Sequence, residues 1–242
     1  MKRLFPILAI ITAILLAYAL YQALVIAPTD ALQGDVYRII YYHVPSAWTA
    51  FLLFFINFAA SITYLIRRNP KADILALVSA EVGVVFCTVV LVTGPIWARP
   101  VWGIWWAPGD IRLTSTLVLW LIYVSYLVLR RFSTSAQTQV LAAALAVFGA
   151  LDVPLVYFSI WFFRTQHPQP VIGGGGSMDP RMLHVLLISW LAWLCFAFLV
   201  CWSRYRLEVL HRDVEEAHAM ASLAGPEGAR AQPSLPLNRS SR

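Results

Sequence analysis

The segment DILALVSAEVGVVFCTVVLVTGP, residues 73–95, is an apolar run of the length that crosses a lipid bilayer as a helix, about 20 residues. Further runs of this kind cover residues 4–26, 46–66, 114–131, 139–161 and 183–203. Hydrophobic residues make up 60% of the chain and charged residues 12%, which is about half the charged fraction of a typical soluble domain. The sequence therefore predicts an all-α membrane protein with six transmembrane helices.

The connections between these runs alternate in character. One set is short and basic, with Lys2 and Arg3, Arg67, Arg68 and Lys71, Arg130 and Arg131, and Arg204, Arg206 and Arg212. The other set covers residues 27–45, 96–113 and 162–182 and is longer. Because short loops rich in Lys and Arg stay in the cytoplasm, we expect both termini inside and the longer connections on the outer face. The net charge of +6 is thus an orientation signal and does not indicate nucleic-acid binding.

This pattern predicts a membrane domain over residues 1–203 and a cytoplasmic tail over 204–242. The first run is long for a signal-peptide core and lacks a convincing cleavage site, so we expect it to be retained. Residues 204–222 are expected to extend the last helix, and residues 224–242, which are rich in Pro, Gly, Ser and Arg, to be disordered.

A tryptophan-rich segment, WARPVWGIWWAPGDIR, occupies residues 97–112. It contains Trp97, Trp102, Trp105 and Trp106. Because Pro and Gly interrupt it too often for a long helix, we expect an ordered outer loop over residues 96–113. Tryptophan favours the membrane surface and offers the largest aromatic face. The segment therefore predicts an apolar platform suited to a large planar ligand.

Two histidines flank the membrane spans on the expected outer side. His43 precedes the second span in YRIIYYHVPSAW, and His167 follows the fifth in WFFRTQHP. Two neutral imidazoles beside an aromatic platform suit the axial positions of haem iron. Arginines on the same side would pair with the haem propionates: Arg38, Arg99, Arg112 and Arg164. His184 is also outer, and topology alone does not choose between it and His167.

Two other functional classes remain open at this point. A membrane electron-transfer subunit carrying haem b usually places histidines deep in facing helices, whereas these lie near one edge. A small-molecule permease would use a polar site at mid-membrane, for which Glu81 and Asp152 are the candidate residues. We expect the Asp152 carboxylate to satisfy backbone groups freed by Pro154 instead.

The three cysteines form no CxxC pair and no haem-attachment motif, and we find no nucleotide-binding motif.

The residues from Trp97 to Thr114, with the stretch around His43, resemble the tryptophan-rich "WWD" family of haem-handling membrane proteins of cytochrome c maturation. Within it the short, six-span chain is similar to the CcmC branch, over about residues 30–203. The family motif, approximately WGxWWxWDxRLT, stands here as WGIWWAPGDIRLT over residues 102–114. Ala107, Pro108 and Gly109 replace the third Trp and lengthen the motif by one residue.

The resemblance implies a protein that is not an enzyme and that carries non-covalent haem b as a transported ligand. It implies His43 and His167 as the iron ligands, in preference to His184. Asp110 is included in the haem-binding set, where we expect it to orient the loop through backbone or Arg112 contacts rather than touch the iron. It further implies presentation of haem at the periplasmic face of the bacterial inner membrane to the haem chaperone CcmE. The other partners implied are the small subunit CcmD and the ABC-type complex of CcmA and CcmB.

Overall fold

The computed structural model describes residues 4–133, 135–163, 165–169 and 178–223, which are mostly helical. The α-helices in these ranges are α1 (Leu4–Tyr21), α2 (Ile40–Arg67), α3 (Pro70–Trp102), α4 (Ile111–Phe132), α5 (Ala136–Ala150), α6 (Asp152–Phe162) and α7 (Pro180–Leu223). The short helices η1 (Gln22–Ile26) and η2 (Asp35–Ile39) link α1 to α2. Six helical stretches are long and apolar enough to cross a membrane, which confirms the predicted all-α class and the six apolar helices.

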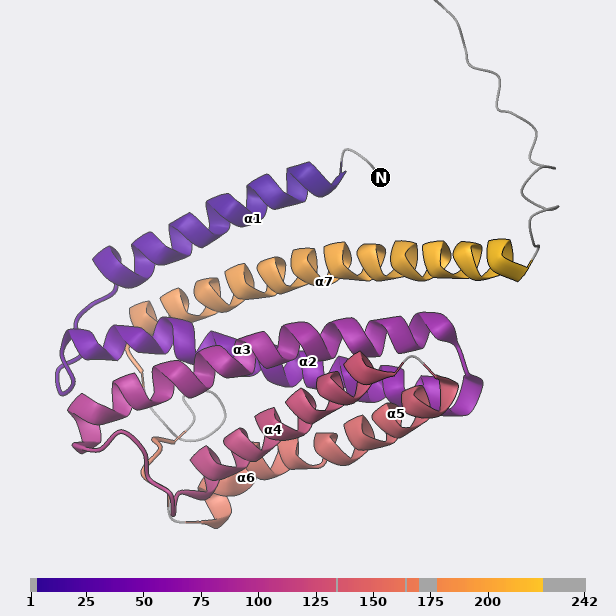
Figure 1. The fold of residues 1–242 in the computed structure, drawn as a ribbon. Coiled ribbons are helices and arrows are strands. Elements are labelled where there is room, and N and C mark those ends of the chain that lie inside the picture. The colour runs from indigo at the N-terminus through magenta and orange to yellow at the C-terminus, as the bar shows by residue number, and fades with distance from the viewer. Residues whose placement is uncertain (1–3, 134, 164, 170–177, 224–242) are drawn as a thin grey trace, which may run out of the picture.

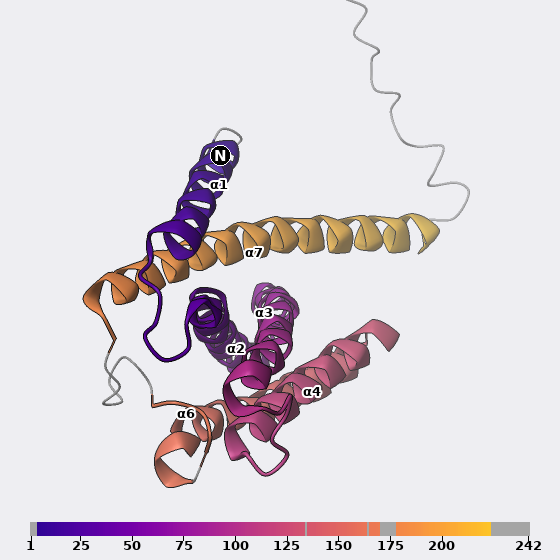
Figure 2. The ribbon, with the colours of Figure 1, turned by 90° about the vertical axis from the view of Figure 1, so that its left-hand side faces the viewer.

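The helices are arranged in layers around α2 and α3. Helix α7 packs on both of them and separates them from α1, while α4, α5 and α6 lie on the opposite side (Figures 1 and 2). The core between α2 and α4 contains the stacked rings of Phe54 and Tyr123, whose centroids are 3.9 Å apart. Helices α2 and α3 approach closely at Gly83, where an added Cβ atom would lie 2.7 Å from the Phe54 ring. Small residues at such contacts let membrane helices pack tightly.

The two sets of connections lie at opposite ends of this bundle. The α2–α3 and α4–α5 connections share one end, which we call the arginine end (Figure 1). The start of α2, the end of α3, the start of α4 and the end of α6 share the other, which we call the histidine end (Figure 1). The segments that contain His43 and His167 thus lie at the same end of the bundle. This agrees with the even number of predicted spans between the two histidines.

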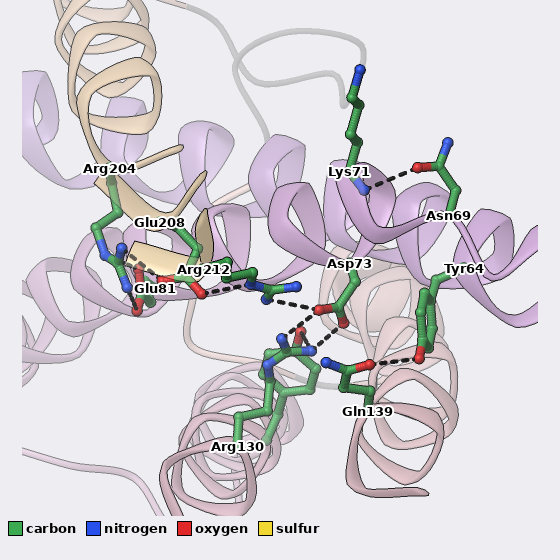
Figure 3. Close-up of polar contacts among 11 residues, drawn as sticks. Tyr64, Asn69, Lys71, Asp73, Glu81, Arg130, Gln139, Arg204, Glu208 and Arg212 are labelled. Atoms are coloured by element: carbon green, nitrogen blue, oxygen red, sulfur yellow. Dashed lines mark hydrogen bonds and ion pairs between the residues drawn. The ribbon is translucent and has the colours of Figure 1, made fainter. Parts of the chain in front are cut away.

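A network of charged side chains ties α3, α4 and α7 together near the arginine end (Figure 3). Asp73 of α3 lies 2.5 Å from Arg130 of α4, in a pair whose side chains are 2% and 8% exposed. Arg212 of α7 also contacts Asp73, at 2.8 Å. Arg204 of α7 pairs with Glu81 at 2.8 Å, so this acid within an apolar run has a counter-ion. Glu208 completes the network by contacting Arg204 and Arg212.

The fifth apolar run forms two helices, α5 and α6, which meet at Leu151. Pro154 lies in the first turn of α6 and has no N–H to donate to the carbonyl of Ala150, so the helix breaks there. The helix is thus interrupted before Pro154, but Asp152 does not take the role expected of it. Its Oδ2 is buried and accepts no hydrogen bond from the described residues, so this oxygen does not satisfy the freed backbone.

The expectation of a loop over residues 96–113 is wrong for its first half. Helix α3 continues through Pro95 and Pro100 to Trp102 and ends at Gly103, which adopts a φ of 76°. Proline is tolerated inside membrane helices because neighbouring groups compensate the lost bond, and the left-handed backbone at Gly103 is what ends the helix. Helix α7 continues to Leu223, while Lys2, Arg3, Arg164 and the predicted disordered segment 224–242 lie outside the described residues.

Candidate functional site

A pocket opens at the histidine end between α2, α3, α4 and α6. Its walls are mainly apolar and aromatic, and the segment that follows α6 contributes His167 and Pro168. The predicted site residues that line it are His43, Trp97, Trp102, Trp106, Arg112 and His167. Apolar pockets with a few converging polar groups are typical of ligand sites. The structure thus gathers these six predicted residues around one space.

The two histidine rings face a common space in this pocket. Their centroids are 6.4 Å apart, and their planes are inclined by 32°. A metal ion bonded at about 2 Å to an imidazole nitrogen lies a little more than about 3 Å from the ring centre. Two imidazoles on opposite sides of one ion would therefore place their centres slightly over 6 Å apart, which is the spacing observed. His43 is buried, with 8% of its surface exposed.

Each histidine has a hydrogen-bond partner at Nδ1. His43 Nδ1 lies 2.8 Å from Oγ1 of Thr93 in α3, and His167 Nδ1 lies 3.2 Å from the carbonyl oxygen of Pro168. Helix α3 lies close to the His43 ring, because a Cβ atom added at Gly94 would be 3.4 Å from His43 Cε1. The ring of His43 is therefore held between two helices.

Burial, followed by the nearby positive charge of Arg112, lowers the pKa of His167 to about 4. The imidazole is therefore neutral at physiological pH. Since the neutral form is the one that binds metal ions, this environment keeps His167 competent as a ligand.

The tryptophans of the segment are placed differently from one another. Trp97 donates its indole N–H to Gln33 Oε1 at 2.7 Å and meets the His43 ring edge-on, at 5.8 Å between centroids. Trp102 and Trp106 line the pocket. Trp105 is outside the lining and 59% exposed. The segment therefore presents three tryptophans to the pocket and one to the surroundings.

Asp110 joins the start of α4 to the segment that carries His167. Its Oδ1 accepts hydrogen bonds from the backbone N–H groups of Arg112 and Leu113, at 3.0 and 3.2 Å, which caps α4. Its Oδ2 accepts from Thr165 Oγ1 at 2.5 Å and from the backbone N–H of Gln166 at 2.8 Å. We call these four bonds the Asp110 bridge. Asp110 is 4% exposed, and it does not line the pocket.

Of the three predicted arginines that the structure describes, one lines the pocket and two do not. Arg112 lines it, and its buried Nη1 has no hydrogen-bond partner among the described residues. Arg38 donates to the carbonyls of Ala23 and Ala27 and so ties η1 to η2. Arg99 donates to the carbonyl of Gly103 at the end of α3. A buried cation without a partner is costly, so Arg112 is the arginine suited to an anionic ligand.

The structure adds residues that sequence reasoning missed. Thr93 precedes Trp97 by four positions, a spacing that places both on one face of a helix, and both contact His43. Thr165 contacts Asp110 over a separation of 55 residues, which no local pattern signals. His184, the competing candidate, is exposed on α7 and absent from the pocket lining.

Comparison with known proteins identifies the family. A model of the family CcmC, heme exporter protein C, matches residues 1–220. Heme exporter protein C of Bradyrhizobium diazoefficiens is 36% identical over 221 residues, covering 90% of this chain and 83% of that protein. The Escherichia coli K12 protein of the same name is 34% identical over 196 residues, covering 81% and 77%. A putative cytochrome c biosynthesis ccmC-like mitochondrial protein of Marchantia polymorpha is 35% identical over 170 residues, covering 70% and 72%.

The site residues gathered above lie within the matched range, and the six long apolar helices agree with a multi-pass membrane protein. The chain therefore belongs to the CcmC family, the heme exporter protein C family of cytochrome c biogenesis, whose members handle and transport haem rather than act as enzymes.

Proposed function

We propose that this protein binds haem b non-covalently in the pocket at the histidine end, with His43 and His167 as the axial ligands of the iron. The observation that carries the proposal is the 6.4 Å separation of the two ring centroids, which suits one metal ion between them. A neutral imidazole is a common axial ligand of haem iron. Haem is the cargo of this site and not a resident cofactor.

The remaining pocket residues fit the rest of the haem molecule. Trp97, Trp102 and Trp106 supply aromatic surface for a flat, apolar macrocycle. The Arg112 guanidinium has a buried nitrogen in need of an acceptor, and arginine bonds carboxylates through a planar fork. We therefore assign Arg112 to a haem propionate.

The histidine end is proposed to face the periplasm from the bacterial inner membrane. Arg67, Arg68, Lys71 and Arg131 all lie at or beside the arginine end, and the positive-inside rule assigns that end to the cytoplasm. Haem bound between His43 and His167 would then be close to the outer membrane surface, within reach of a partner in the aqueous phase.

The partner that takes the haem is proposed to be the periplasmic chaperone CcmE, docking over the loop between α3 and α4. In this loop Ile104 and Trp105 are 41% and 59% exposed. Exposed aromatic residues beside a pocket are typical contact residues of protein interfaces. CcmD and the CcmA–CcmB complex are the further partners proposed, and the work of ATP hydrolysis is assigned to that complex.

The absorption spectrum of the purified protein tests the ligand assignment. We expect His43→Ala and His167→Ala each to shift or abolish the haem Soret band, and the exposed-site control His184→Ala to keep the wild-type spectrum. A haem band lost in His184→Ala and retained in His167→Ala would show the assignment to be wrong.

A second variant separates binding from delivery. Trp105→Ala removes an exposed side chain outside the pocket, so we expect normal haem loading and slower transfer of haem to purified CcmE. Equal transfer rates for Trp105→Ala and wild type would exclude this side chain from the docking surface.

A further inference from the structure

We propose that Thr93 is a positioning residue for haem ligation: its hydroxyl keeps the His43 proton on Nδ1 and so leaves the Nε2 lone pair free for iron. The inference rests on the proposed function, because it assigns a role to Thr93 through His43. Thr93 would not touch the haem itself and would act on the iron through His43.

The Thr93 hydroxyl donates its hydrogen bond within its own helix. Thr93 Oγ1 lies 2.6 Å from the carbonyl oxygen of Val89, four residues earlier in α3. A carbonyl oxygen only accepts hydrogen bonds, so the hydroxyl is the donor in that contact. Threonine in helices commonly bonds in this way.

Which group donates in the hydrogen bond between Thr93 and His43 follows from this contact with Val89. With its proton donated to Val89, Thr93 Oγ1 has only lone pairs to offer to His43 Nδ1, which lies 2.8 Å away. The imidazole must therefore be the donor, as the Nδ1–H tautomer. In a neutral imidazole the other nitrogen, Nε2, then carries the free lone pair.

His167 reaches the same state by a separate contact. Its Nδ1 lies 3.2 Å from the carbonyl oxygen of Pro168, which only accepts. Both imidazoles are thereby selected as Nδ1–H tautomers, with rings 6.4 Å apart. The Thr93 contact differs in that it joins two helices, so it fixes the orientation of the His43 ring as well as its proton.

This arrangement has a chemical consequence for the iron. A hydrogen bond accepted from the far nitrogen of a ligating imidazole fixes the ring and makes the ligand more basic, and its loss typically weakens metal binding by about 10–100-fold. A more basic ligand stabilises the ferric state, so removing the acceptor should also raise the reduction potential of the bound haem.

The test compares Thr93→Val with Thr93→Ser and with Thr88→Val. Valine keeps the β-branched shape of threonine but lacks the acceptor oxygen, whereas serine restores it. Thr88 is a matched control in the same helix, because it also bonds the carbonyl four residues earlier and accepts a hydrogen bond from Trp120, away from the pocket.

The first readout needs no haem. Nitrogen-15 NMR of histidine-labelled apo protein reports which ring nitrogen carries the proton, and we expect His43 to be the Nδ1–H tautomer in wild type, Thr93→Ser and Thr88→Val. In Thr93→Val we expect a mixture of tautomers. An Nε2–H tautomer at His43 in the wild type would overturn the proposal without any variant having to fold.

The second readout is the haem-loaded protein. We expect Thr93→Val to bind haem about 10–100-fold more weakly and with a more positive midpoint potential, Thr93→Ser to return both toward wild type, and Thr88→Val to leave both unchanged. A Thr93→Val protein with wild-type tautomer and potential would overturn the inference alone. Unchanged haem binding in His43→Ala would instead overturn the proposed function, so the two failures are distinguishable.

Discussion

Replacing Asp110 by Asn should weaken the docking of the segment that carries His167 while leaving α4 capped. The remaining amide oxygen still accepts from the N–H groups of Arg112 and Leu113, which supply the cap. The amide nitrogen that replaces Oδ2 is a donor, and it meets the N–H of Gln166, formerly bonded at 2.8 Å. The Thr165 hydroxyl can rotate to accept a hydrogen bond from the new amide nitrogen. Only the hydrogen bond from the Gln166 backbone N–H is therefore lost.

The magnitude follows from the charge of the acceptor that is removed. A hydrogen bond to a charged group contributes about 1.5–3 kcal/mol, and each 1.4 kcal/mol changes an equilibrium constant about tenfold. If haem binding requires the segment 165–167 to be docked on Asp110, the haem affinity should fall by about 10–100-fold. Asp110→Ala should lower stability further by about 1 kcal/mol, since the helix cap is lost as well.

Titration of the purified protein with haem, followed by absorbance, measures this loss. The matched control is Asp179→Asn, which alters a carboxylate that caps the start of α7 by bonding the backbone N–H of Arg181. We expect wild-type affinity in that control. The reasoning would be refuted by wild-type haem affinity in Asp110→Asn together with a clear loss in His167→Ala, or by equal losses in Asp110→Asn and Asp179→Asn.

Three further predictions concern stability, measured by thermal or denaturant unfolding in detergent. Arg130→Met should destabilise the protein by about 3 kcal/mol, the lower end for a broken buried pair, because a second arginine still contacts Asp73. The His167 pKa of about 4 lies below the unfolded value of 6.5, so the unfolded state binds more protons between these values. Stability of the apo protein should therefore fall as the pH drops from about 6.5 to 4, by at most about 3 kcal/mol, and fall less in His167→Gln. Gly83→Ala should cost about 1–3 kcal/mol through overpacking, whereas Gly109→Ala, with nothing within 4 Å of an added Cβ, should be neutral.

Much of the fold was predictable because the membrane leaves few options. A bilayer requires every spanning segment to satisfy its own backbone hydrogen bonds, so long apolar runs become helical, and all six predicted runs lie in long helical stretches, the fifth of them divided into α5 and α6. The end of α3 was mispredicted for a related reason. Pro95 and Pro100 read as helix breakers in water, but α3 continues through both to Gly103.

The site was predictable in its parts but not in its connections. The parity of the spans placed His43 and His167 at one end, and the dense tryptophans marked the neighbouring surface. The contacts that position these histidines, Thr93 in another helix and Asp110 in a distant loop, depend on tertiary packing. The partner of Glu81 is likewise Arg204, 123 residues away, so a residue that looked like an isolated acid in the sequence is part of an ion pair.

The two histidines differ in how firmly the fold holds them. His43 is part of α2 and is bonded across to α3, whereas His167 lies in a non-helical segment attached largely through the Asp110 carboxylate. A carrier must release what it binds, and a metal held from two sides leaves most readily when one bond opens before the other. If His43 and His167 ligate the haem as proposed, the weaker attachment of His167 would make it the first ligand to dissociate, and His43 would retain the haem until the receiving protein supplies a replacement ligand on the vacated side.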